Sequence, residues 1–223
     1  GVFILFIFCL AGNMQAQKKL LPALKQTQAD SLAQEQVIYH DRVVPFNTLA
    51  RDFIQKLTGE ASYKGLTPEQ VIGGWLLYPE VWRNEPLIYI KNTELQHLLN
   101  LQTPYARLTD LFDGSVYRLR EHWQREQGQQ NKLAKAIQET DEKVGLILML
   151  EKGTFIHPLP TDGSVQPLSE LEVKAELLYN RIPFSKILFM INLSLGVLSF
   201  LLLLHNSLQR NILSPKAKTI SRT

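Results

Sequence analysis

The chain has 223 residues and a formal net charge of +3, with 24 Lys or Arg residues against 21 Asp or Glu residues. Four of the basic residues lie in the tail that follows the last apolar run, so the rest of the chain is close to neutral and lacks the basic surface of a nucleic-acid-binding protein. The single cysteine, Cys9, excludes an intrachain disulfide and the CxxC and CxxCH motifs, and with them a thiol oxidoreductase or a c-type cytochrome.

Residues 1–16 form the first apolar segment, in which the run from Val2 to Leu10 is too short to cross a bilayer alone. Two interpretations fit: the core of a signal peptide that ends near Ala16, or the end of a truncated transmembrane helix. We favour the truncated helix, because no basic leader precedes the run and the cleavage pattern is poor. Both interpretations place the following residues outside the cytoplasm. Residues 17–35 are polar, and we expect them to form a linker with some helical character.

The predicted domain spans residues 36–181. It begins with VIYHDRVVPF, which we expect to be a short strand or an extended segment that ends at Pro45. Asn47 or Thr48 then caps a helix, TLARDFIQKL, whose apolar residues recur on one face. Gly59 fits the position just after the end of this helix.

A second helix is predicted from TPEQ at residues 67–70, because Thr, Pro and Gln at this spacing form a capping box with a proline at the first helical position. Gly73 and Gly74 inside the helix indicate that another backbone packs closely there, since glycine otherwise weakens a helix. We expect the nearby aromatic residues to form the core where the two helices meet: Phe53, Trp75, Tyr78 and Trp82.

The remaining elements are predicted to be mostly helical. PLIYI at residues 86–90 is a short strand candidate, and residues 93–100 form a short helix. A helical stretch begins at Thr109, and a long amphipathic helix runs from Val116, breaks at Gly128, resumes at Lys132 and reaches Leu150. A loop then leads to Ser169, which caps a last helix over residues 171–179. The fold class is therefore mainly α, with one or two short strands.

The longest apolar run is ILFMINLSLGVLSFLLLL, at residues 187–204, and it contains no charged residue. A helix of this length is roughly 27 Å long, close to the thickness of the bilayer hydrocarbon, so we predict a transmembrane helix. The basic segment at residues 205–223 should stay in the cytoplasm, which places the domain in the periplasm of a bacterial inner membrane. Asn192 and Ser199 share one face of this helix, which should contact other transmembrane helices.

Several short motifs occur in order between His40 and Ile90: HDRVVPFNTLARDF, then LTG, then YKGLTPEQV, then Pro-x-x-Trp and PLIYI. Further along come LREHWQREQ, Phe-x-x-Pro-Leu-Pro and AELLYNRIPFSKILF. This series resembles the extracytoplasmic domain of fused system II cytochrome c biogenesis proteins, the haem export and ligation machinery of the ResB/CcsA type. The resemblance covers most of the chain from His40 to Leu204.

The resemblance implies a complete protein with many spans that carries haem outward and attaches it to the CxxCH thiols of apocytochrome c. The tryptophan-rich haem-handling motif of that family is not found in this sequence, in which Trp75, Trp82 and Trp123 are widely separated. No haem-ligand histidine can therefore be transferred to this chain. The fragment would be a connecting periplasmic domain that does not itself bind haem tightly, with the catalytic step elsewhere.

Six residues are candidates for contact with haem or a partner. His40 and His205 could serve as haem ligands, although a solvated loop explains His40 and a side chain reaching the membrane interface explains His205. Arg42 and Arg51 could bind haem propionates or an acidic partner, or simply form ion pairs within the domain. Asn47 and Thr48 complete the set, because they lie in the segment most like the family.

Two functions from different classes are compatible with these residues. The first is part of a membrane haem-delivery or cytochrome c synthase complex whose partners are other transmembrane helices and apocytochrome c. The alternative is a membrane-anchored extracytoplasmic binding or sensor module without catalytic activity. Further spans with a tryptophan-rich motif after Thr223 would indicate the first, and a signalling domain there would indicate the second.

Overall fold

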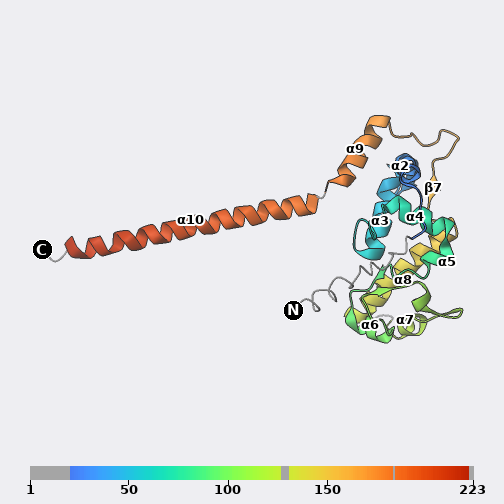
Figure 1. Cartoon of the computed structure of the whole chain (residues 1–223), viewed down its shortest axis with the longest axis horizontal. Coiled ribbons are helices and arrows are strands. Elements are labelled where there is room, and N and C mark those ends of the chain that lie inside the picture. Colours follow the sequence, from blue (N-terminus) through green and yellow to red (C-terminus); the bar gives the residue numbers. More distant parts are fainter. Residues whose placement is uncertain (1–20, 127–130, 183, 221–223) are drawn as a thin grey trace, which may run out of the picture. The chain divides into compact units, whose positions relative to one another are not determined.

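The computed structural model describes residues 21–126, 131–182 and 184–220 (Figure 1). They divide into two compact units, with the boundary between Leu177 and Leu178. Helix accounts for 59% of the structure and strand for 11%, which confirms the mainly helical prediction. The predicted apolar segment at residues 1–16 and the predicted break at Gly128 lie outside the described residues.

The elements of the first unit are short. Its helices are α2 (Gln26–Gln34), α3 (Phe46–Thr58), α4 (Pro68–Leu77), α5 (Pro79–Trp82), α6 (Thr93–Leu98), the 3-10 turn η1 (Thr109–Leu111), α7 (Arg120–Glu126), α8 (Lys132–Glu151) and most of α9 (Glu170–Arg181). Its strands are β1 (Gln36–Tyr39), β2 (Arg42–Pro45), β3 (Ile88–Tyr89), β4 (Tyr105–Ala106), β5 (Phe112–Asp113), β6 (Val116–Tyr117) and β7 (His157–Pro158). The strands form three small antiparallel sheets, ordered β2-β1-β7, β3-β4 and β5-β6.

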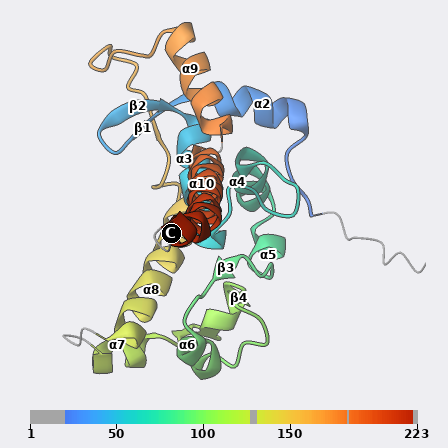
Figure 2. The ribbon, with the colours of Figure 1, turned by 90° about the vertical axis from the view of Figure 1, so that its left-hand side faces the viewer.

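Figure 2 shows how these elements are arranged within the first unit. The β1–β2 hairpin, α2, α3 and α4 lie toward one end, and α6 and α7 lie toward the other. Helix α8 extends from the α7 end toward α3 and α4, and contacts both of them. The unit therefore has one continuous core, in which α8 joins its two ends.

The segment predicted as a single strand ending at Pro45 is instead a hairpin, so that prediction was wrong. Val37 pairs with Val44 and Tyr39 pairs with Arg42 across a two-residue turn. The turn residues, His40 and Asp41, both adopt left-handed conformations, with φ values of 50° and 59°. Such a turn matches the twist of the strands. Its usual sequences are Asn-Gly and Asp-Gly, so the sequence His-Asp does not predict it.

The predicted helix ends were partly correct. Helix α3 begins at Phe46 after an extended Pro45, so neither Asn47 nor Thr48 is its N-cap, and both side chains bond elsewhere. Gly59 ends α3 in the left-handed conformation, with φ of 82°, as predicted. The capping box of α4 is also confirmed: the Gln70 amide donates to Thr67 Oγ1, and the Thr67 amide donates to Gln70 Oε1.

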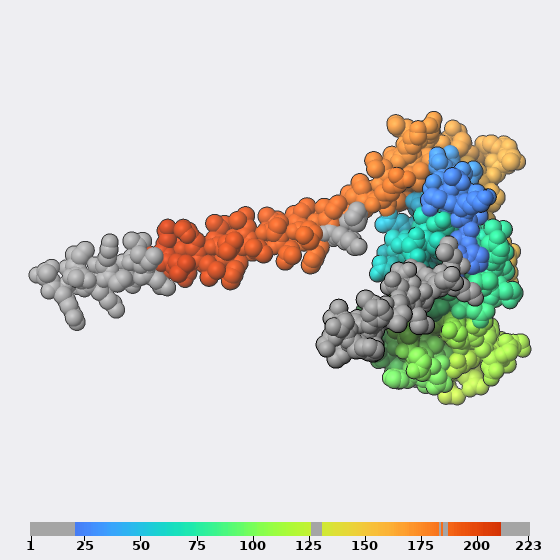
Figure 3. Space-filling view, in the orientation of Figure 1, coloured from blue at the N-terminus to red at the C-terminus, as the bar shows by residue number. Residues whose placement is uncertain are grey.

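The glycine pair in α4 meets the chain that precedes α2. A Cβ atom added to Gly74 would lie 2.7 Å from the carbonyl oxygen of Pro22, and one added to Gly73 would lie 2.3 Å from a methyl group of Leu24. The predicted close packing is therefore present. Part of the stretch expected to act as a linker forms α2, which buries Ala29 and contacts α3 and α4. Figure 3 shows the blue atoms of this stretch against the teal atoms of the following helices.

The aromatic core prediction holds for three of its four residues. Trp75 and Trp82 are buried with ring centroids 6.2 Å apart, and Phe53 is buried against Phe155. Tyr78 was wrongly included, because it follows the last residue of α4 and is 46% exposed. The apolar face of α3 forms the opposite wall of the core.

The chain between Thr109 and Leu119 is not helical beyond one turn, contrary to the prediction. Only η1 forms at Thr109, and β5 and β6 then pair around Gly114, whose φ is 58°. Gly114 and Ser115 form the two-residue turn between the paired Asp113 and Val116, and glycine at the first turn position explains the hairpin, because it adopts a positive φ without strain. Helices α8 and α9 begin close to the predicted positions, and the Glu172 amide donates to Ser169 Oγ in the expected cap.

The second unit is dominated by α10 (Phe184–Ile220). Its stretch from Ile187 to Arg210 has 24 residues and contains an 18-residue window with a mean hydropathy of 2.5, so it is long and apolar enough to cross a membrane. Among the described residues it is the one helix that meets this condition. Its large apolar side chains are exposed, which distinguishes it from the core helix of a soluble domain and is consistent with membrane anchoring.

Candidate functional site

Five of the six residues selected from the sequence lie on the β1–β2 hairpin or on α3, and four of them, all except Asn47, form one group. Arg42 Nη2 and Thr48 Oγ1 both donate to Glu176 Oε1 on α9, at 3.2 Å and 2.8 Å. Thr48 and Arg51 lie on one face of α3, because they are three residues apart. We name the set the hairpin cluster, and its members are His40, Arg42, Thr48, Arg51, Asp52 and Glu176.

The hairpin cluster concentrates positive charge around Asp52. Partial loss of hydration of the charged form raises the pKa of the Asp52 carboxyl, and the charges of His40, Arg51 and Arg42 oppose that rise. Burial and the nearby Asp52 carboxylate also raise the pKa of Tyr39. The cations of the cluster can therefore interact with anionic groups. Its own carboxylates, Asp52 and Glu176, already neutralise part of this positive charge.

The other two candidates lie apart from the hairpin cluster. Asn47 Nδ2 donates to the buried carboxylate of Glu69 on α4, at 2.5 Å, so Asn47 links two helices of the core. His205 belongs to the second unit, where its ring nitrogen lies 3.1 Å from the Gln209 side-chain nitrogen on the same helix. Neither arrangement indicates a ligand contact.

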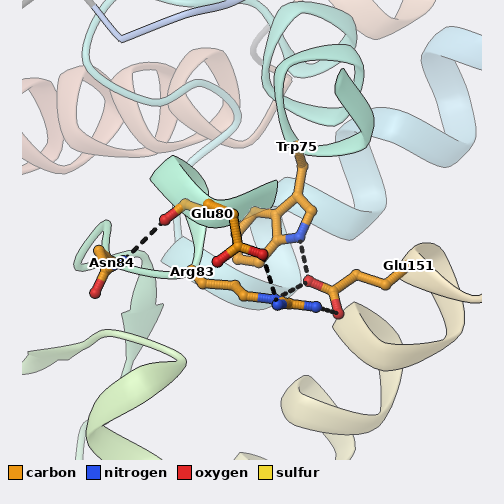
Figure 4. Close-up of polar contacts among 5 residues, drawn as sticks. All are labelled: Trp75, Glu80, Arg83, Asn84 and Glu151. Carbon is orange, nitrogen blue, oxygen red and sulfur yellow. Dashed lines mark hydrogen bonds and ion pairs between the residues drawn. The ribbon is translucent and has the colours of Figure 1, made fainter. Parts of the chain in front are cut away.

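A second polar network joins α4, α5 and α8, and Figure 4 shows its residues. Glu151 accepts hydrogen bonds from Arg83 Nε and Arg83 Nη2, both at 2.9 Å, and from Trp75 Nε1 at 3.0 Å. Arg83 Nη1 also donates to the exposed Glu80 at 3.1 Å. Burial alone would raise the pKa of Glu151, but hydrogen bonds from Arg83 and Trp75 outweigh it and lower that pKa. This bidentate pair fastens the end of α8 to the helices that carry the tryptophans.

Sequence reasoning missed both carboxylates that organise these networks. Glu176 lies 128 residues after Thr48, and Glu151 lies 76 residues after Trp75. Glu151 had one available signal, since it ends a long helix just before Lys-Gly and has an apolar helix face beside it. Nothing near Glu176 in the sequence distinguishes it from the other acidic residues of α9.

Two features of the described residues bear on metal and haem binding. No group of three or more His, Cys, Asp or Glu residues in the described ranges could hold a metal ion. His40 lies in an exposed turn, with its ring centroid 4.1 Å from that of Tyr39. A haem site needs an axial ligand inside an apolar pocket, and His40 does not provide that environment.

Comparison with known proteins gives one informative similarity. No protein-family profile matches the chain. The chain is similar to Protein NrfI from Wolinella succinogenes, with 33% identity over 129 residues. The similar region covers 54% of this chain and 14% of that protein, so the chain spans only a small part of the length of its relative.

Proposed function

We propose that this chain is the extracytoplasmic part of a membrane haem-delivery complex that supports covalent haem attachment to periplasmic apocytochrome c. The observation that carries the proposal is the similarity to Protein NrfI, which supports a link to cytochrome c biogenesis. The ordered motif series from His40 to Ile90 favours the system II, ResB/CcsA type of machinery. In this proposal the domain faces the periplasm of a bacterial inner membrane, and α10 crosses that membrane beside other helices of the complex.

The fold supports this proposal because the motif-bearing residues build one packed region. The hairpin, α3, α4, α5 and β3 all contribute to the same core. Such a region gives a partner a rigid surface, as expected of a domain that positions a substrate protein. We expect apocytochrome c to be that partner.

In this proposal the whole complex transports haem, and the domain contacts it only transiently. The best-placed contact residue is Arg51, because Arg42 is already engaged by Glu176. In the part of the chain that the structure describes, no carboxylate lies within ion-pair distance of Arg51. A guanidinium in this position could bind a propionate or an acidic side chain of the partner in a bidentate manner.

Deletion of the complete gene tests the proposal. Haem staining of c-type cytochromes should show a strong loss in the deletion strain and recovery when the gene is restored. A gene carrying Arg51→Ala should restore less haem-bearing cytochrome c than one carrying Arg107→Ala, an exposed arginine outside the hairpin cluster, at equal protein abundance. Normal cytochrome c levels in the deletion strain would reject this function and favour the anchored binding or sensor module.

A further inference from the structure

A groove of about 480 Å³ lies between the β3–α6 connection and the first half of α8. The connection contributes residues 89–93, and α8 contributes residues between Lys132 and Lys143. Its volume lies in the range of small-molecule sites, roughly 300–1,000 Å³. The groove shares no residue with the hairpin cluster or with the Arg83–Glu151 network.

The charged residues of the groove are strongly biased toward lysine. Four lysines line it, against one glutamate: Lys91, Lys132, Lys135, Lys143 and Glu139. This imbalance stands out because the domain as a whole carries nearly equal numbers of basic and acidic residues. The groove is therefore a local positive region on a nearly neutral domain.

The positive charge is arranged along one side of α8. Lys132, Lys135, Glu139 and Lys143 follow one another at helical spacing, so they share a face over about 16 Å of the helix. The N-terminus of the 20-residue α8 lies at the Lys132 end, where the helix dipole adds partial positive charge.

Few carboxylates of the domain neutralise the positive charge of these lysines. Lys135 reaches Glu139 only at 4.0 Å. Within the described residues, neither Lys91 nor Lys132 has a carboxylate at ion-pair distance. Lys143 Nζ donates to the backbone carbonyl of Tyr89, a neutral acceptor.

The pKa of Lys143 indicates that the positive charge of the groove is not fully balanced by carboxylates. Burial lowers the pKa of its ammonium group, Glu139 partly offsets that effect, and the nearby Lys56 lowers the pKa further. An added anion would favour the charged form of Lys143. The floor is preformed, because Ile90, Ala136 and Thr140 are buried in the core beneath it.

We infer that this groove binds a small anion that carries two or more carboxylate or phosphate groups. More than one anionic group is required, because a single group cannot engage lysines spread over about 16 Å. The same chemistry is available from a free polyanion and from a lipid headgroup that carries two phosphates. The inference is independent of the proposed function, since it depends only on the groove.

Calorimetric titration of the full chain in a neutral detergent tests the inference. The soluble probes are citrate and inorganic pyrophosphate. The lipid probe is cardiolipin, whose headgroup carries two phosphates, in mixed micelles with the same detergent, and phosphatidylcholine micelles are the neutral comparison. Saturable binding of a soluble probe indicates a free polyanion, and binding of cardiolipin alone indicates a lipid headgroup. Absence of saturable binding to any anionic probe at millimolar concentration would overturn the inference.

Matched variants show whether the groove is responsible. The double variant Lys132→Gln/Lys135→Gln should weaken binding about tenfold, since it removes two ammonium groups. The control, Lys152→Gln/Lys174→Gln, removes the same charge from exposed lysines outside the lining and should change the affinity less than about twofold. Should the double variant unfold, Lys91→Gln tests the groove from the other side. Equal weakening by test and control variants would contradict the inference.

Discussion

Removing the carboxylate of Glu151 should destabilise the domain far more than removing that of Glu80, although both bind Arg83. The Glu151 side chain is 13% exposed and accepts three hydrogen bonds, whereas the Glu80 side chain is 82% exposed and accepts one from this arginine. The two variants therefore separate the effect of a partly buried network from that of a surface ion pair.

The magnitude for Glu151→Ala follows from the groups left without a partner. The indole N–H of Trp75 lies in the core, and an unsatisfied buried donor costs about 1–3 kcal/mol. Arg83 is 38% exposed and can regain water, so its share is about 1 kcal/mol or less. We expect a loss of about 3 kcal/mol in the free energy of unfolding. Glu80→Ala should cost less than about 0.5 kcal/mol, as exposed pairs usually do.

Urea unfolding of the full chain in detergent, followed by tryptophan fluorescence, measures these differences. Trp75 and Trp82 report directly, because both are buried beside the network. Glu151→Gln should fall between the wild type and Glu151→Ala, since its amide oxygen can still accept the indole hydrogen bond. Similar losses for Glu151→Ala and Glu80→Ala would refute the reasoning.

The stability that Glu151 contributes should depend on pH in a predictable direction. The pKa of Glu151 is lowered in the folded state, so its contribution is fully present above its ordinary value of 4.5 and is lost as the pH falls through the folded value. The stability difference between wild type and Glu151→Gln should therefore be largest at neutral pH and shrink in acid. A difference that grows in acid would contradict the assigned direction.

Two further predictions concern packing and topology. Gly74→Ala should lose about 1–3 kcal/mol, because its Cβ would lie 2.7 Å from the Pro22 carbonyl oxygen, whereas Gly145→Ala meets no atom within 4 Å and should gain up to about 1 kcal/mol in the same unfolding assay. Equal effects of the two substitutions would reject the close contact. Alkaline phosphatase fused after Gly128 should be active in cells and the same enzyme fused after Lys218 inactive, and the reverse pattern would reject the proposed orientation.

The helices that were predicted well have strong local signals. The capping box at Thr67 and the glycine after α3 each fix a helix end through contacts made within one turn. The two hairpins were missed because their turns depend on left-handed residues, and His40 adopts that conformation only with the support of the paired strands. The helical assignment from Val116 failed for the same reason, because the turn at Gly114 and Ser115 pairs Val116 and Tyr117 with the preceding strand.

Only some residues of the candidate site could be predicted from the sequence. The local motifs identified Arg42 and Thr48, but their common acceptor, Glu176, is distant in the sequence and resembles its acidic neighbours. Side chains that meet across more than 100 residues leave no periodic trace in a single sequence. The lysines of the groove were missed similarly, because Lys91 and Lys143 come together only when β3 packs beside α8.

The contacts of the hairpin cluster change how its residues should be interpreted. Arg42 and Thr48 fasten the hairpin and α3 to α9, since both donate to Glu176, which lies two residues before the second unit begins. Substitution of either residue would therefore disturb the structure of the domain together with any binding. Arg51 occupies the same face of α3 without an ion-pair partner among the described residues, so its loss should affect binding with little structural change. A functional role for the cluster depends on Arg51 more directly than on the residues that hold α9 in place.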